Sequence, residues 1–92
     1  MYNNLIHEDK EKLYKNTLEE LGNYDASRTS QVYFLLAQLE SNKAWSYQPN
    51  GDTSKRMANV KALKIIDRAL PKYKEENEGT SNLRTLRYQI LP

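Results

Sequence analysis

The chain of 92 residues contains no cysteine, a single histidine, and only three glycines and three prolines. Without cysteine it has no disulfide, no thiolate ligand for zinc and no thiol nucleophile. Because His7 is the one imidazole, most metal-binding patterns are excluded as well. The scarcity of glycine and proline favours long helices over a sheet with many turns, so we predict an all-α protein.

Long apolar runs are also lacking. The longest strongly apolar stretch, residues 32–37, is far shorter than the roughly 20 residues that a membrane-spanning helix needs. The first residues do not form the apolar run of a signal peptide, so we expect a cytoplasmic protein with no membrane partner. A chain of this length closes one modest core, which predicts a single domain, residues 1–92, whose stability an oligomer would raise.

Catalytic and metal-binding motifs are missing too. No serine has a histidine and an acid at a recognisable spacing, and the three glycines form no phosphate-binding loop. His7 and Glu11 lie one helical turn apart, but two ligands do not make a metal site. Glu19 and Glu20 are adjacent, so they point in different directions on a helix. We therefore expect no enzyme activity, no catalytic residue, no bound metal and no cofactor.

Helical spacing of apolar residues, together with residues that begin and end helices, defines the expected elements. They are helices at about residues 7–21, 27–47 and 54–70, and a short C-terminal segment at 80–92. The C-terminal segment fits helical and strand spacing alike, and we favour a short helix capped by Thr80 or Ser81. The expected fold is a three- to four-helix bundle.

Residues that favour turns set the expected helix ends. Gly22 suits the left-handed conformation that ends the first helix, and Asp25 or Ser27 caps the second. The stretch "QPNGDTS" around Pro49 breaks the chain between the second and third helices, which predicts a central antiparallel helical hairpin. Pro71 either kinks the third helix or starts a short new helical turn.

The second helix is apolar nearly all round, which is typical of the central helix of a bundle or of a helix that also forms a subunit interface. The residues expected to be buried are Leu13, Tyr14, Leu18 and Leu21 on the first helix, Val32, Leu35, Leu36 and Leu39 on the second, and Val60, Leu63, Ile66 and Leu70 on the third. Seven tyrosines carry too many hydroxyls for a small core to hide, so some lie at a surface or an interface.

Charge is concentrated in one segment, although the net charge is only +2. Residues 55–74 carry seven basic and one acidic side chains, whereas residues 1–26 carry three basic and six acidic ones. Four cations of the third helix recur three and four positions apart, along one line that we name the basic stripe. They are Lys61, Lys64, Arg68 and Lys72. The basic stripe would bind an anionic ligand, dock on the acidic first helix of its own or a neighbouring chain, or form a solvated face partly neutralised by Asp67.

Aromatic residues near the helix ends complete the candidate binding site. Trp45 and Tyr47 lie beside the predicted turn, where they would close a ligand pocket or plug one end of the bundle. Tyr73 follows the basic stripe and offers a further surface on which a base stacks. The expected ligand-binding residues are Lys61, Lys64 and Arg68, with Arg28 and Lys43 from the opposing helix and with Trp45 or Tyr47 stacking on a base.

The stretch "SRTSQVYFLLAQLESNKAW" resembles the helical-hairpin module of phage anti-defence sponge proteins, which sequester cyclic nucleotide signals of the CBASS and Thoeris systems. The resemblance is carried by Ser27, Arg28 and Ser30 at the start of the helix, by Leu39 and Glu40, and by Trp45. In that family the hairpin helices assemble into a hexamer, and anionic cyclic nucleotides lie between subunits on basic and aromatic side chains. The resemblance implies a homo-oligomer that binds a nucleotide in the host cytoplasm, with Arg28 as one contact.

Three functions are compatible with the sequence. The first, which we favour, is a non-enzymatic protein that sequesters an anionic nucleotide-type ligand through a basic helix face and aromatic residues. The second is a small phage- or plasmid-type interaction module that inhibits a host protein, since tyrosine, tryptophan and arginine are enriched at interfaces. The third is a helical nucleic-acid-binding protein, against which the acidic N-terminal segment and the mild net charge argue.

Overall fold

The fold is given by a computed structural model, which describes the backbone of residues 2–22, 24–46 and 51–91 and the side chains of residues 8–22, 24–42 and 59–91. The described residues form four α-helices and one 3-10 turn. In chain order they are α1 (Tyr2–Leu21), α2 (Ala26–Ser46), α3 (Gly51–Ala69), η1 (Leu70–Lys72) and α4 (Glu78–Ile90). These ranges contain no strand, so the prediction of an all-α protein with three to four helices is confirmed.

Local signals explain where α1 ends and α2 begins. Gly22 has a φ of 55°, the left-handed conformation predicted for it after the first helix. Asp25 rather than Ser27 caps α2, because its Oδ1 accepts a hydrogen bond from the Arg28 backbone N–H at 3.0 Å. At its other end, α1 begins at Tyr2, earlier than the predicted residue 7.

The third helix begins three residues earlier than predicted and ends one residue earlier. It runs from Gly51 to Ala69, and Pro71 then lies in the first turn of η1, which confirms the new helical turn rather than a kink. Tyr47 and the turn predicted around Pro49 lie outside the described residues. The central antiparallel hairpin therefore stays a prediction.

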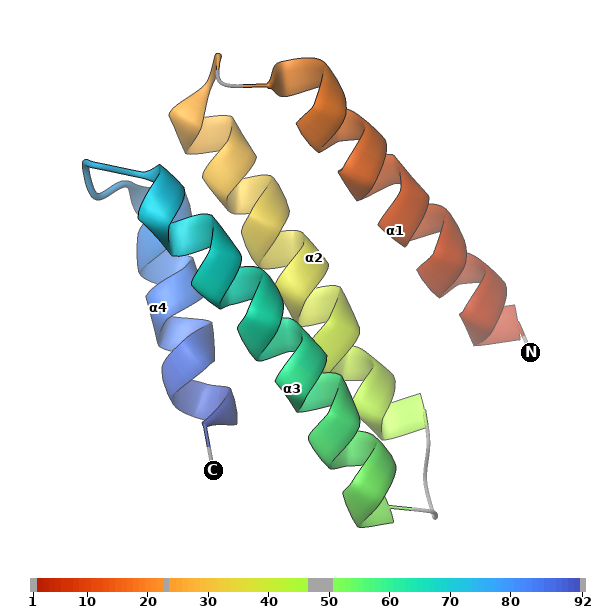
Figure 1. Cartoon of the computed structure of the whole chain (residues 1–92). Helices are drawn as coiled ribbons and strands as arrows, with labels where there is room; N and C mark the ends of the chain where they lie inside the picture. The colour runs from red at the N-terminus through yellow and green to blue at the C-terminus, as the bar shows by residue number, and fades with distance from the viewer. Residues whose placement is uncertain (1, 23, 47–50, 92) are drawn as a thin grey trace.

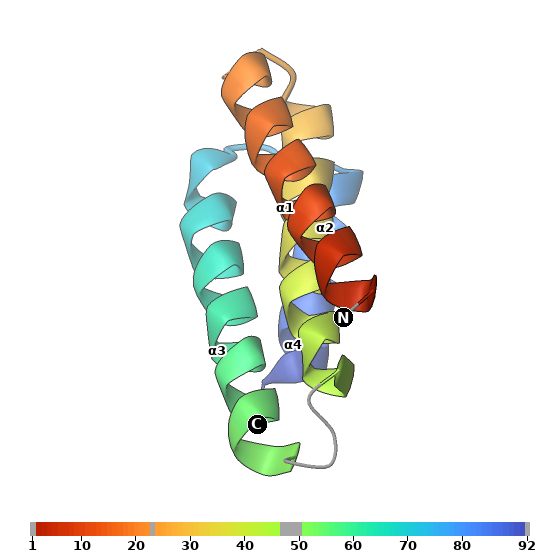
Figure 2. The same cartoon turned by 90° about the vertical axis from the view of Figure 1, so that its right-hand side faces the viewer.

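The helix α2 is the one around which the other three are arranged (Figure 1, Figure 2). It contacts α1 on one side and α3 and α4 on the other. Contacts with three neighbours explain why its sequence is apolar nearly all round. Its buried residues are Thr29, Ser30, Val32, Leu36, Ala37, Leu39 and Glu40.

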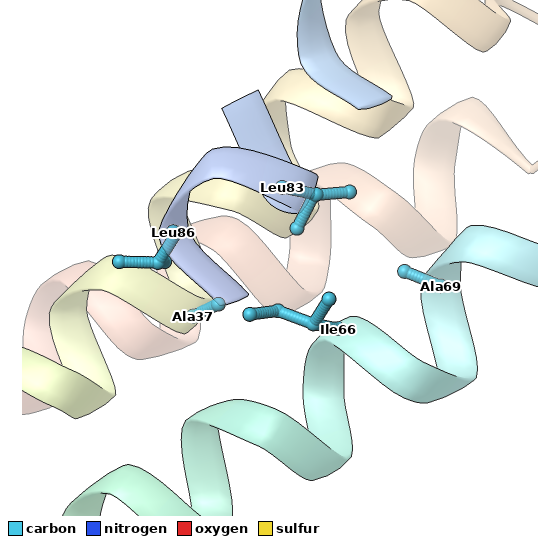
Figure 3. Close-up of a cluster of buried hydrophobic side chains, with 5 residues drawn as sticks. All are labelled: Ala37, Ile66, Ala69, Leu83 and Leu86. Carbon is cyan, nitrogen blue, oxygen red and sulfur yellow. The ribbon is translucent and has the colours of Figure 1, made fainter. Parts of the chain in front are cut away.

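The main core lies where α2, α3 and α4 meet, and Figure 3 shows its most buried side chains. They are Ala37, Ile66, Ala69, Leu83 and Leu86. Small alanines on α2 and α3 let the helices approach, while the branched side chains of α3 and α4 fill the space between them. Partly buried side chains that pack against this cluster are Tyr33, Phe34, Ile65, Leu70 and Ile90.

The helix α1 is attached through a thin contact. None of its side chains from residue 8 to 21 is buried, and Leu13 is 60% exposed. Tyr14, Leu18 and Leu21 are only half-buried. The expected burial of Leu13 is therefore wrong, because α1 lies on the outer side of α2 and has a neighbour on one side only.

Two further apolar residues are exposed where burial was expected. Leu35 on α2 is 38% exposed and Val60 on α3 is 44% exposed. Val60 lies about 120° around the helix from the fully buried Ile66, so it points away from the core side of α3. Apolar spacing alone does not show which sides of a helix have neighbours.

The C-terminal segment is a helix, as favoured, but its cap differs from the prediction. Asn77 caps α4: its Oδ1 accepts a hydrogen bond from the Thr80 backbone N–H at 2.9 Å, and its own N–H donates to Thr80 Oγ1 at 2.8 Å. The helix begins earlier than expected, so Thr80 lies inside its first turn. A hydrogen bond of 2.7 Å from Ser30 Oγ to Asn77 Oδ1 joins the start of α4 to the start of α2.

The molecule exposes more surface than most proteins of its size. Its accessible surface is 6853 Å², against about 5,500 Å² for a typical folded monomer of 10.8 kDa. Its radius of gyration is 13.4 Å, against about 12.3 Å for a typical domain of this length. Both values agree with the position of α1, which extends the molecule sideways instead of closing over the core.

Candidate anion-binding site

Three cations of the predicted site lie together on α3. Lys61, Lys64 and Arg68 are exposed, and successive members are about 300° and 400° apart around the helix, so they stay near one line. Lys72, the last cation of the basic stripe, is exposed too but lies in η1, beyond the end of α3. None of these four cations forms an ion pair with a described carboxylate. The basic stripe is therefore available to an anion from outside the chain.

Asp67 does not neutralise the basic stripe in the way the sequence suggests. Its Oδ1 accepts a hydrogen bond from Arg87 Nε at 2.9 Å, which directs its charge toward α4. The carboxylate closest in sequence to the basic stripe is thus engaged with a cation of another helix.

Hydrogen bonds between elements fix how the basic stripe lies along α2. Ser41 Oγ donates to Asn59 Oδ1 at 3.1 Å, just before the first cation. The hydroxyls of Thr29 and Tyr73 are 2.7 Å apart, just after the last one. The N-terminal end of α2 therefore lies beside the end of the basic stripe, and its C-terminal half lies beside the beginning.

The other predicted ligand contacts are divided between the two ends of α2. Arg28 is exposed in the first turn, near the end of the basic stripe. Lys43 and Trp45 belong to the last turn, and their side chains, like the whole of Tyr47, lie outside the described residues. Fifteen positions, or about 22 Å along a helix, separate Arg28 from Lys43. Within one chain the structure does not bring these two cations together.

The surface is hollowed where the basic stripe ends. A hollow of about 180 Å³, the smaller hollow, lies between the end of α1, the first turns of α2 and η1. Its lining residues are Gly22, Ala26, Thr29, Tyr33, Lys72 and Tyr73. One cation of the basic stripe and two tyrosines therefore meet in a single depression.

Tyr73 is held in place by Thr29. Thr29 Oγ1 and the hydroxyl oxygen of Tyr73 share a hydrogen bond of 2.7 Å. Burial raises the pKa of the Tyr73 phenol, although the hydrogen bond with Thr29 acts in the opposite direction. The phenol is thus neutral near pH 7 and does not repel an anion.

A larger hollow of about 480 Å³ adjoins the first. It shares Ala26, Lys72 and Tyr73 with the smaller hollow. Its other lining residues are Ser27, Lys74, Glu75, Glu76 and Asn77. Two lysines, a hydroxyl and an amide therefore lie around this hollow together with two carboxylates.

Sequence reasoning identifies Tyr73 as a stacking residue but does not find its neighbours. Thr29 and Tyr33 are four positions apart, so they share one line of α2, and this much is visible in the sequence. Tyr73 is 44 positions from Thr29. Their contact depends on how η1 and the residue after it pack against the start of α2. The sequence carries no local signal for that packing.

Among the described residues, no group of three or more His, Cys, Asp or Glu side chains is placed to hold a metal ion. The same part of the chain has no helix that is both long enough and apolar enough to cross a membrane. The side chain of His7 lies outside it.

No protein-family model, no curated protein and no solved structure matches this chain. A functional proposal therefore rests on the chemistry of the site. That chemistry is a line of exposed cations leading to a hollow with two tyrosines.

Proposed function

We propose that this protein is a non-enzymatic binding protein that sequesters an anionic, nucleotide-type ligand on the basic stripe. One observation carries the proposal: the basic stripe is exposed without ion-pair partners among the described residues, and its last cation lines a hollow with two tyrosines. Phosphates form charge-assisted hydrogen bonds with lysine and arginine, and bases stack on aromatic rings. The resemblance of residues 27–45 to phage anti-defence sponges supports the same class of ligand.

Isothermal titration calorimetry with cyclic di-AMP tests this proposal. Lys64→Ala and Arg68→Ala each remove one phosphate contact and are expected to weaken binding about tenfold, since such a contact contributes roughly 1.5 kcal/mol. Lys12→Ala is the matched control, because Lys12 is an exposed cation of α1 outside the basic stripe. Its affinity is expected to equal that of the wild type.

Two outcomes would contradict the proposal. Unchanged affinity in both Lys64→Ala and Arg68→Ala would remove the basic stripe from the binding site. A protein that binds no cyclic di-AMP but shifts DNA or RNA in a gel, with a steep dependence on salt, would instead be a nucleic-acid-binding protein.

We also propose that the protein is a homo-oligomer. The chain exposes about 1,300 Å² more surface than a typical monomer of its mass, and each partner in a standard interface covers about 800 Å². The side of α1 that bears Leu13 is the face we expect a second copy to cover, because no described side chain of this helix is buried.

Sedimentation equilibrium measures the assembled mass. The wild type is expected to exceed the 10.8 kDa of one chain, and Leu13→Lys is expected to shift it toward the monomer. Tyr88→Ser is the control, because Tyr88 is also exposed but belongs to α4. A wild-type monomer throughout the micromolar range would contradict the assembly while leaving ligand binding to its own test.

Inhibition of a host protein is the second candidate function. Tyr24 is 91% exposed and Tyr88 is 86% exposed, and tyrosines in such positions are typical of protein–protein interfaces. A stable complex with one host protein that Tyr24→Ser or Tyr88→Ser abolishes, in a protein that binds no cyclic di-AMP, would favour this function over sequestration.

A further inference from the structure

The two hollows at the end of the basic stripe form a pair of unequal size. They share three lining residues, so they are neighbours on the surface. Small-molecule sites usually measure about 300–1,000 Å³. The larger hollow, at about 480 Å³, falls in that range, whereas the smaller hollow, at about 180 Å³, has room for one group of a ligand only.

The two hollows also differ in the side chains that they offer. The smaller hollow is lined by two tyrosines, Tyr33 and Tyr73, and a tyrosine ring is a surface on which a base stacks. The larger hollow adds Lys74 to the shared Lys72, together with the hydroxyl of Ser27 and the amide of Asn77. An aromatic group is suited to the first environment and a phosphate to the second.

We infer that the smaller hollow, between Tyr33 and Tyr73, holds a nucleobase and that Lys72 and Lys74 bind the phosphate of the same nucleotide. The inference rests on the proposed function and makes it more specific: the ligand is a nucleoside phosphate recognised by its base as well as by its charge. The 2.7 Å hydrogen bond to Thr29 holds Tyr73 before any ligand arrives, so less ordering is needed on binding.

Two carboxylates weaken the larger hollow as an anion site. The Nε atom of Arg84 lies 3.1 Å from Oε1 of Glu76, and this ion pair offsets the charge of Glu76. Glu75 forms no ion pair with a described cation and lines the same hollow as the two lysines. Glu75→Gln is therefore expected to raise the affinity for a phosphate-bearing ligand about two- to fivefold.

A comparison of AMP with ribose 5-phosphate tests the inference on the wild-type protein. The two probes carry the same sugar and phosphate, and only AMP has a base. Stacking of one base is expected to make AMP bind at least about fivefold more tightly in a calorimetric titration. Equal affinities for the two probes would overturn the base-binding role of the smaller hollow.

The substitution Tyr33→Leu separates base binding from phosphate binding. Leucine preserves apolar contact with the core, on which Tyr33 packs, but offers no ring for stacking. The affinity for AMP is expected to fall toward that for ribose 5-phosphate, which should itself be unchanged, because only the ring of Tyr73 is left to stack on the base. Tyr88→Leu is the matched control, because Tyr88 is an exposed tyrosine of α4 that lines neither hollow, and this variant should retain AMP affinity within about twofold. Equal losses for both probes in Tyr33→Leu would indicate a structural effect and count against the inference.

The inference and the proposed function fail in different ways. If AMP, ribose 5-phosphate and cyclic di-AMP all fail to bind, the proposed function is wrong and the inference falls with it. If AMP and ribose 5-phosphate bind equally well and Arg68→Ala weakens both, the basic stripe binds anions and only the nucleobase assignment is wrong.

Discussion

Gly79 lies where α4 packs directly against the backbone of α2. A Cβ atom at this position would stand 2.5 Å from the backbone nitrogen of Gln31 and 2.6 Å from the carbonyl carbon of Ser30, closer than real Cβ atoms come. These are backbone atoms, so they cannot give way unless α2 itself moves. Glycine is therefore required here by the space between two helices.

The substitution Gly79→Ala is expected to lower the free energy of unfolding by about 1–3 kcal/mol, the usual cost of overpacking. The loss outweighs the better helix propensity of alanine. Urea denaturation followed by circular dichroism measures the change, and Thr85→Ala, at an exposed position of α4, is the control with an expected change near zero. Wild-type stability in Gly79→Ala would mean that α4 does not dock this closely.

Tyr73 makes stability depend on alkaline pH. Burial raises the pKa of its phenol above the ordinary value of 10.0, against the lowering effect of the Thr29 hydrogen bond, and the nearby Tyr33 raises it further. The folded protein then retains the phenol proton at pH values where the unfolded chain has lost it. Because the folded state binds more protons, the free energy of unfolding falls as pH rises through the folded-state pKa.

The substitution Tyr73→Phe is expected to remove this contribution. Above about pH 10, the wild type should lose stability more steeply than the variant, because phenylalanine does not titrate. All other residues are the same in both proteins, so the difference between the two curves belongs to Tyr73. Urea denaturation at a series of pH values gives both curves, and parallel curves would show that folding does not change the pKa of this phenol.

At the scale of the elements, burial is unevenly distributed between the first and last helices. The side chains of α1 from residue 8 to 21 include no buried one. The shorter α4 has four buried residues, which are Gly79, Thr80, Leu83 and Leu86. The two helices are therefore held to α2 with very different strength.

Amide protons of α1 are expected to exchange much faster than those of α2 in native-state hydrogen exchange. Local opening of α1 exposes few buried contacts, whereas opening of α2 disrupts contacts with all three other helices. Mass spectrometry of peptides from both helices measures the exchange rates at several protein concentrations. Protection of α1 that rises with concentration would support a second copy covering it, and protection equal to that of α2 at every concentration would contradict the thin contact.

The helices are predictable from the sequence because their signals are local. Gly22, Asp25 and Pro71 act on residues beside them. Gly22 has its predicted role, Asp25 is one of the two predicted caps, and Pro71 has one of its two predicted roles. The cap of α4 is different, because Asn77 and Thr80 both carry suitable side chains. Asn77 is also the partner of Ser30, which belongs to a helix about fifty positions earlier, so the choice between them depends on tertiary packing.

The packed faces and the candidate site are predictable only in part. Leu35 and Val60 satisfy apolar helical spacing yet are exposed, since burial depends on where the neighbouring helices lie. The alignment of the basic stripe follows from spacing within one helix. The smaller hollow cannot be predicted in this way, because it depends on how η1 and Tyr73 pack against the start of α2.

At the scale of the whole molecule, the two hollows join distant parts of the chain. They are lined by the end of α1, the start of α2, η1 and the connection that follows it. A ligand bound there stabilises the folded state as a whole. At a concentration of 100 times Kd it is expected to raise the free energy of unfolding by about 2.7 kcal/mol, which corresponds to a rise in Tm of roughly 10–20 °C.

Differential scanning calorimetry with cyclic di-AMP, at one protein concentration, measures this rise in Tm. Arg68→Ala is the comparison, because the same ligand concentration is a smaller multiple of its weaker Kd and should raise its Tm less. Absence of any rise at a concentration that saturates the wild type would mean that the ligand binds the unfolded chain equally well.

The contact between the starts of α2 and α4 is polar and almost inaccessible to water. Ser30 is 0% exposed and Thr80 is 1% exposed, and no buried side-chain nitrogen or oxygen in the described ranges lacks a hydrogen-bond partner. Contacts between leucine side chains form in several alignments of two helices, whereas these hydrogen bonds form in one alignment only. Sliding α4 by one turn, about 5.4 Å, would strand buried hydroxyls and an amide without partners. A few small polar side chains thereby select the single register in which the last helix completes the fold.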